Sequence, residues 1–288
     1  MRRVLTTSLL AFTVLFLLPA MAAIGWWSTV DRPSSWSNAS WGTSGTLPPA
    51  ASVEGPVVHV MSARTGGLKG ALALHSWIVT KRDGAARYDR YDKVGWGSPI
   101  RRNAYAADAF WYSNPPVILT TLRGERAARA IQGIERAVAS YPYRGRGGYR
   151  IWPGPNSNSF VAHVLREVPE LDVNLPETAV GRDYPTDGRL LAWDAARRDL
   201  RLSLWGYAGL TVGLTSGLEL NALGLVTGFD PLRPAIKLPG FGRIGMGAVP
   251  RVDAGEVGGE IEGGIGAARR TAGGRSRYSL AQSTPPDK

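Results

Sequence analysis

The 288-residue chain has no cysteine and only three histidines. Without thiols it can form no disulfide, thiolate metal site or cysteine nucleophile, so any nucleophilic side chain must carry oxygen. His59, His75 and His163 show no metal-ligand spacing. The sequence also lacks a P-loop and a dinucleotide-binding fingerprint. We therefore expect neither a metal site nor a cofactor.

Acidic residues are scarce: 34 basic side chains face 23 acidic ones, giving a net charge of +11. The arginines are scattered and match no nucleic-acid-binding motif, so we expect no nucleic-acid partner. An excess of positive charge favours anionic lipid or polymer of the cell envelope instead. The 36 glycines and 20 prolines favour strands, turns and loops over long helices.

The N-terminus carries an uncharged apolar run, Val4–Trp27, directly after Arg2 and Arg3. Its core, Leu9–Leu18, is followed by the small-x-small pattern Ala20–Ala22, which is typical of signal cleavage. The whole run is also long enough to span a bilayer, so residues 1–27 are predicted as either a signal peptide or a retained signal anchor. The two arginines predict that the rest of the chain faces the periplasm or the exterior.

Composition divides the remaining chain into four parts. Residues 28–52 read as a linker rich in Ser, Pro and Gly, and residues 53–190 as an α+β core. Residues 191–247 are predicted as a Gly-rich hairpin and closing segment of the same domain. Residues 248–288 have the composition of a disordered tail. The expected architecture is an antiparallel sheet packed against two helices, which periodicity places at about Gly124–Tyr141 and Ser157–Glu167.

A histidine and a tryptophan share one face of a predicted strand. Alternation across Gly70–Thr80 places His75 and Trp77 opposite the aliphatic side chains. Asp83-Gly84 is a strong hairpin signal, followed by a third strand near Arg87–Trp96. With a two-residue loop, His75 would lie directly opposite Asp92, in side-chain contact.

The loop from Trp152 to Phe160 ends in residues that favour a helix start. Ser157 is predicted at or near a helix N-terminus, where free N–H groups and the helix dipole favour an anion. Asn156 and Ser157 are also excellent N-caps, and capping alone explains both residue types.

Leu200–Phe229 is almost wholly apolar and contains regularly spaced glycines. Small residues four apart can form a transmembrane packing face. Alternating leucines indicate strands instead, and Glu219 and Asn221 would be costly in lipid. We therefore predict a buried Gly-rich β-hairpin in preference to a second membrane span.

The chain resembles the bacterial family known as domain of unknown function 3750, over about Val57 to Gly245. The run Pro153–Phe160 is the most specific part of this resemblance. The resemblance implies no particular activity. The matching stretches are Ala73–Ile78, Tyr88–Gly97, Tyr141–Tyr143, Tyr149–Phe160, Leu218–Phe229 and Pro234–Gly240.

More distantly, the chain looks like circularly permuted papain-like folds, including the lecithin:retinol acyltransferase group. In those folds a strand histidine precedes a nucleophile that opens a helix in an Asn-Cys-x-x-Phe type motif. The likeness implies that Ser157 replaces the cysteine, that His75 is the base and that Asp92 orients it. The serine at this position departs from the family pattern, and means either a serine variant or a catalytically inactive fold.

The sequence features and the resemblances predict two alternative functions. The first is a cell-envelope hydrolase or acyltransferase that acts on an amide or ester of envelope peptide or a lipid-like group through Ser157 and His75. The second is a non-catalytic envelope binding or structural protein that holds an anionic ligand at the basic loop Arg144–Arg150. The expected binding residues are Asn156, Asn158, Trp77, Trp152 and Arg150.

Overall fold

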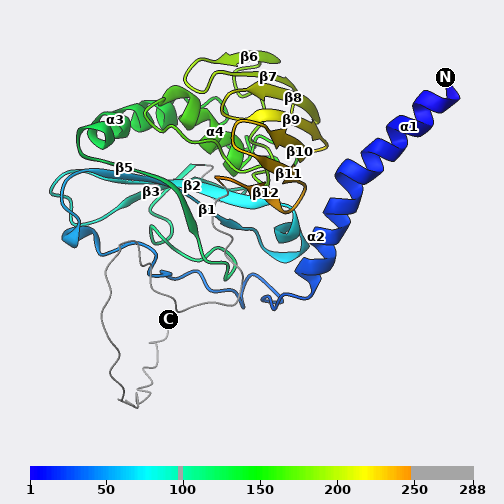
Figure 1. Ribbon diagram of the computed structural model, residues 1–288. Coiled ribbons are helices and arrows are strands. Elements are labelled where there is room, and N and C mark those ends of the chain that lie inside the picture. Colours follow the sequence, from blue (N-terminus) through cyan, green and yellow to red (C-terminus); the bar gives the residue numbers. More distant parts are fainter. Residues whose placement is uncertain (97–99, 248–288) are drawn as a thin grey trace, which may run out of the picture. The chain divides into compact units, whose positions relative to one another are not determined.

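The structure is a computed structural model that describes residues 1–96 and 100–247. The predicted tail at 248–288 lies outside these residues. The described part is an α+β fold with two antiparallel sheets (Figure 1). The first sheet has the strand order β4-β3-β2-β1-β5. Its strands are β1 (Val57–Arg64), β2 (Leu74–Lys81), β3 (Asp89–Lys93), β4 (Ile100–Arg102) and β5 (Val117–Arg123).

Two helices, α3 (Gly124–Ser140) and α4 (Ser157–Glu167), cover one face of this sheet. Helix α3 buries apolar side chains at helical spacing, among them Ile131 and Ile134. These pack in one buried cluster with Phe160 of α4 and Ile78 of β2. The predicted sheet packed against two helices is therefore confirmed.

The other face of the first sheet carries a second buried cluster, built around Trp77 and Trp111. The segment predicted as a linker contributes to it, because Leu47 is buried there. Asp108 fixes this segment by accepting hydrogen bonds from the Thr43 hydroxyl (2.7 Å) and the Leu47 N–H (3.2 Å). Residues 43–47 thus form part of the wall over this face.

The second sheet is an antiparallel meander of seven strands in the order β12-β11-β10-β9-β8-β7-β6 (Figure 1). The predicted hairpin falls on four of its strands, but its burial was predicted wrongly. Leu202 and Leu218 are about 40% and 44% exposed, whereas Glu219 is buried. The strands are β6 (Leu191–Asp194), β7 (Asp199–Leu204), β8 (Ala208–Gly213), β9 (Gly217–Ala222), β10 (Leu225–Asp230), β11 (Ala235–Leu238) and β12 (Gly242–Gly245).

The N-terminal apolar run is helical throughout, as α1 (Arg2–Phe12), the π-helical turn η1 (Thr13–Leu17) and α2 (Leu18–Ser28). Arg2–Ser28 is long and apolar enough to cross a membrane, with a mean hydropathy of 2.2 over an 18-residue window, and is compatible with either an anchor or a signal peptide. Its C-terminal end packs on the domain, where the Trp27 indole N–H donates to the Gly67 carbonyl (2.9 Å).

Candidate functional site

Helix α4 begins at Ser157, as predicted, with Asn156 as its N-cap. The Asn156 side-chain oxygen accepts from the N–H groups of Asn158 (2.9 Å) and Ser159 (3.2 Å). In return, the Ser159 hydroxyl accepts from the Asn156 N–H (3.1 Å). This reciprocal capping box satisfies helix-terminal donors that would otherwise be buried without partners.

The two asparagines also connect separate segments of the fold. The Asn156 amide donates to the carbonyls of Ile151 and Val180, both at 2.9 Å. The Asn158 amide donates to the carbonyls of Leu74, on β2, and Val180, again at 2.9 Å. The side-chain amides of Asn156 and Asn158, both predicted as binding residues, therefore hold α4, β2 and the 180 loop together.

His75 and Asp92 meet, as the sequence predicted, with 3.5 Å between His75 Nε2 and Asp92 Oδ2. The His75 ring stacks on Trp111 at 3.7 Å. Asp92 also pairs with Arg90, at 3.1 Å. Burial lowers the pKa of His75, although Asp92 acts in the opposite direction. The imidazole is thus a buried, predominantly neutral group.

The predicted strand register was wrong by two residues. Ile78 pairs with Tyr91, which by continuation places Asp92 opposite Trp77. The cause is an irregular stretch between the 83–84 turn and Asp89, where β3 begins. A shift of two residues keeps each side chain on its face, so the contact between His75 and Asp92 survives the change.

Ser157 and His75 lie on opposite sides of the first sheet. His75 stacks with Trp77 and Trp111 in the aromatic cluster, whereas α4 packs on the other face through Phe160. Within residues 1–96 and 100–247, no hydrogen bond joins Ser157 to His75. A general base must reach the proton it removes, and this arrangement does not bring His75 to Ser157.

The other predicted binding residues are dispersed. The Trp77 indole donates to the Ala107 carbonyl (2.9 Å) in the buried cluster. The Trp152 indole donates to the Leu223 carbonyl (2.8 Å), which connects the 150s loop to the β9–β10 turn. Arg150 is exposed, and its backbone N–H donates to the Pro155 carbonyl (2.8 Å). These three residues do not form one site.

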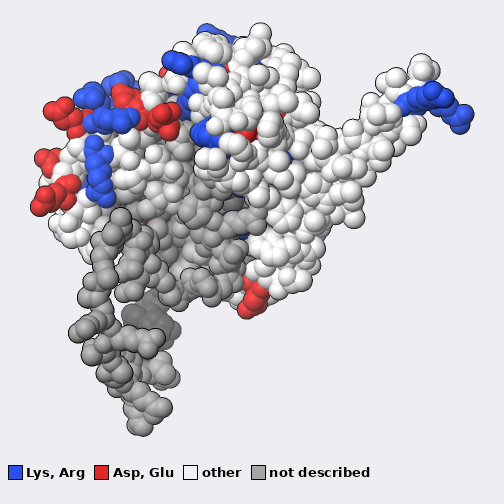
Figure 2. Space-filling model, in the orientation of Figure 1, with Lys and Arg blue, Asp and Glu red and all other residues white. Residues whose placement is uncertain are grey.

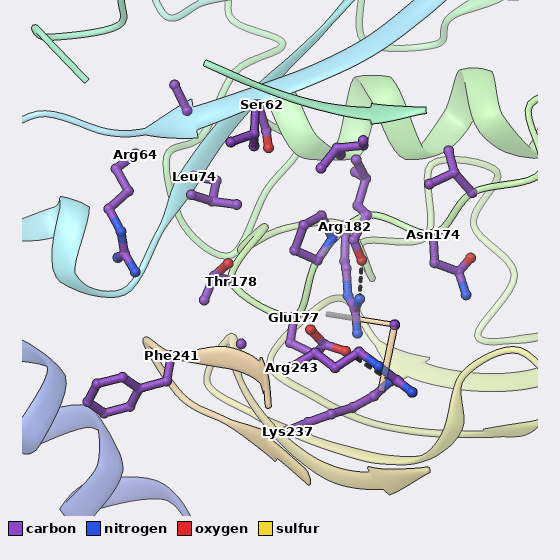
Figure 3. Close-up of a pocket in the computed structure, with 18 of the residues that line it drawn as sticks. Ser62, Arg64, Leu74, Asn174, Glu177, Thr178, Arg182, Lys237, Phe241 and Arg243 are labelled. Carbon is purple, nitrogen blue, oxygen red and sulfur yellow. Dashed lines mark hydrogen bonds and ion pairs between the residues drawn. The ribbon is translucent and has the colours of Figure 1, made fainter. Parts of the chain in front are cut away.

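A pocket of about 320 Å³ lies where strands of both sheets meet the loop 172–178. Figure 3 shows Ser62 and Arg64 of β1 on one side and Lys237 of β11 on another. This volume is typical of small-molecule sites. Among the charged residues that line it, only Glu219 stood out in the sequence, as a charge unsuited to lipid.

Four buried charged residues, here called the charged quartet, stand at one wall of the pocket: Glu177, Arg182, Glu219 and Lys237. The Lys237 ammonium lies 2.9 Å from Glu177 and also pairs with Glu219, which in turn pairs with Arg182. Burial would raise the pKa of Glu177, but Lys237 and Arg182 hold it below its usual range. Burial raises the pKa of Glu219 despite the same cations.

The rim of the pocket combines arginines with aromatic rings from the apolar helix. The Arg64 guanidinium lies 5.1 Å from the Trp26 ring and donates to the Gly240 carbonyl (3.1 Å). Trp26 also faces Phe241, with ring centroids 6.4 Å apart. The pocket therefore opens beside α2, with cationic and apolar groups at its mouth.

Positive charge predominates in the lining, which contains five basic side chains and three acidic ones. Two of the basic groups, Arg233 and Arg243, pair with the buried Asp230 behind them. Over the described residues, no group of three or more acidic or imidazole side chains is placed to hold a metal ion. One sequence signal could have pointed to the pocket, namely a charge at the central position of Leu218-Glu219-Leu220 and of Ile236-Lys237-Leu238.

These features define an α+β protein of two antiparallel sheets, with an apolar helix at the mouth of its pocket. Residues 55–184 match the family model described as "Protein of unknown function (DUF3750)", which confirms the resemblance seen in the sequence over that range. No curated protein and no solved structure matches the chain. The likeness to permuted papain-like folds stays a prediction.

Proposed function

We propose that the chain is a non-catalytic binding protein of the cell envelope, anchored by its N-terminal helix with the domain facing the periplasm or the exterior. Its ligand would be an anionic amphiphile, a molecule with an acidic head and an apolar chain. The observation that carries the proposal is the excess of basic side chains in a pocket whose rim includes Trp26 and Phe241.

Arg233 and Arg243 are the groups best suited to the acidic head. Each donates to Asp230, but a guanidinium has five N–H donors, so both retain donors for a second anion. The Arg233 side chain is 46% exposed and therefore accessible. Trp26 and Phe241 would contact the apolar part of the ligand, as aromatic side chains do in most small-molecule pockets.

Acyl transfer by Ser157 is supported less well. The first sheet separates Ser157 from His75, and the asparagines beside Ser157 are bonded to backbone carbonyls. A serine hydroxyl without a base in reach is a weak nucleophile. The pocket, rather than the helix start, therefore carries the proposed function.

The test is binding of a fluorescent fatty acid to the full-length protein in detergent, with the matched fatty alcohol as neutral ligand. We expect the acid to bind more tightly. The double variant Arg233→Gln/Arg243→Gln should weaken acid binding about tenfold or more, because charge-assisted hydrogen bonds are lost. Arg189→Gln removes a charge that does not line the pocket and is the control.

Two results would overturn the proposal. Equal affinity for acid and alcohol would show that the pocket does not select an anion. Unchanged acid binding by the double variant would place the ligand elsewhere. Labelling of Ser157 by a serine-directed fluorophosphonate, lost in Ser157→Ala, would restore the acyl-transfer hypothesis.

A further inference from the structure

The second sheet has its polar face inside and its apolar face outside. Facing the rest of the domain are buried polar residues such as Asp199, Thr211, Glu219 and Lys237. Most of the alternate positions on the same strands are apolar and exposed. An antiparallel sheet of a soluble protein has the opposite arrangement, with apolar side chains on the core and polar ones in water.

Strand register aligns the exposed side chains into rows across the sheet. One row crosses all seven strands and a second crosses four. Every member is more than a third exposed. We call these residues the apolar face: Trp193, Leu200, Val212, Leu218, Phe229, Ile236 and Ile244 in the first row, and Leu191, Leu202, Leu210 and Leu220 in the second.

So large a surface requires an apolar partner. A soluble monomer commonly exposes no more than a few hundred Å² of apolar surface in one patch. Here large apolar side chains lie side by side over seven strands. Near the turns at one end of the sheet, Trp205 and Tyr207 are also about half exposed. Exposed Trp and Tyr beside an apolar surface are typical of the membrane–water interface.

The N-terminal helix places this sheet at the level of a membrane. Strand β10 contacts the turn Thr13–Leu17, in the middle of the helix, and Phe16 and Ala20 are buried. Of the three parts of the N-terminal helix, α1 alone has no buried residue. Its 11 residues would span roughly 17 Å, whereas the hydrocarbon core of a bilayer is about 30 Å thick.

A membrane crossed by this helix must therefore extend past residue 12, to the depth at which the helix meets the sheet. Residues 4–28 contain no charged side chain, and Figure 2 shows basic side chains only at the free tip of the helix on the face in view. The apolar face is the part of the domain surface that suits contact with the remaining thickness of the hydrocarbon core. The backbone N–H and C=O groups of the inner strands are paired between strands, as lipid requires, whereas the outer edges of β6 and β12 have no strand partner among the described residues and must lie outside the hydrocarbon.

We infer that the apolar face of β6–β12 is inserted into one leaflet of the bilayer, beside the N-terminal helix. The domain would then be held on the membrane by two elements, a spanning helix and a sheet. This inference is independent of any ligand in the pocket. It also explains why the strands place their charges toward the protein, since an outward charge would have to enter lipid.

The absence of cysteine makes a direct test possible, because each single-cysteine variant carries one label. We would attach an environment-sensitive fluorophore to full-length protein with Leu218→Cys on the apolar face. Leu9→Cys in the helix and Asp83→Cys in an exposed turn of the first sheet are the lipid and water controls. Each protein is reconstituted in phosphatidylglycerol-containing vesicles, with acyl-chain nitroxide or aqueous iodide as quencher.

Insertion predicts that the Leu218 label behaves like the Leu9 label, with blue-shifted emission, quenching by nitroxide lipid and loss of iodide quenching. Iodide quenching equal to that of the Asp83 label would overturn the inference. Protection from both quenchers would also overturn it, because the face would then be covered by a second copy. Leu200→Asn/Leu218→Asn should reduce the nitroxide quenching of a label at Leu210→Cys, with folding checked by thermal unfolding.

Discussion

At the residue scale, the motif that is most distinctive in the sequence proves to hold the fold together. The side chains of Asn156, Asn158 and Ser159 all bond to backbone of other segments or to each other. Ser159 donates to the Gly181 carbonyl at 2.6 Å. Such a buried network fixes a unique local structure, and removing one member leaves further buried groups unpaired, beside the Asn158 side-chain oxygen that already has no partner.

The two residues at the helix start should respond differently to substitution. Asn156→Ala removes the N-cap, takes away the side-chain donor to the Ile151 carbonyl and leaves the Val180 carbonyl with only the Asn158 amide as its side-chain donor. We expect it to lower the free energy of unfolding by about 1–3 kcal/mol. Ser157→Ala should cost about 0.5 kcal/mol or less. Urea unfolding in detergent measures both, and an equal loss would contradict the assignment of the cap to Asn156.

At the element scale, close packing between β7 and β8 depends on a glycine at position 213. A Cβ added at Gly213 of β8 would collide with Asp199 of β7. Asp199 accepts hydrogen bonds from the N–H groups of Thr215 and Ser216, both at 3.1 Å, and so holds the β8–β9 turn. Position 213 requires glycine because any larger side chain would collide with Asp199, whose carboxylate is buried.

Gly213→Ala should therefore destabilise the second sheet, by about 1–3 kcal/mol, because overpacking displaces the Asp199 carboxylate. Gly42→Ala is the matched control, since a Cβ there would meet nothing within 4 Å. Hydrogen exchange followed by mass spectrometry should show faster exchange in β7–β9 for Gly213→Ala alone. Equal exchange in the two variants would refute the packing argument.

At the scale of the whole molecule, the three histidines share one electrostatic property. Burial lowers the pKa of His59, His75 and His163. For His59 the pKa falls from 6.5 to about 4, with Arg123 adding to the effect. Below pH 6.5 the unfolded chain thus binds protons that the folded chain does not. The stability that His59 contributes is complete above about pH 6.5 and is lost as the pH falls toward 4, and His75 and His163 act in the same direction.

We expect the protein to be less stable at pH 5.0 than at pH 7.5, with His59 contributing about 1–2 kcal/mol of the difference. Glu219 contributes with the opposite sign, because its pKa is raised by burial. The measurement therefore compares urea unfolding of His59→Gln with that of the unsubstituted chain at both pH values. The variant should lose less stability on acidification, and an equal loss would show that His59 is not responsible.

Local pattern predicted much of the fold and little of the site. Helical spacing placed α3, capping chemistry placed the start of α4, and alternation put His75 and Trp77 on one face. Each of these depends on residues close together in the chain. The pocket depends on residues far apart in the chain, because Arg64, Glu177 and Lys237 come from segments more than fifty residues apart.

The sequence by itself determined the N-terminal apolar helix, the α+β class and the alternation along each strand. Tertiary structure decided which set of alternating side chains faces inward, and in β7–β9 it is the polar set. It also decided that Ser157 and His75 lie on opposite faces of the first sheet. The physical reason is that strand periodicity defines two faces without assigning either to the core. That assignment is made by what packs against each sheet, which is the two helices on the first sheet and charged loop residues such as Glu177 and Arg182 on the second.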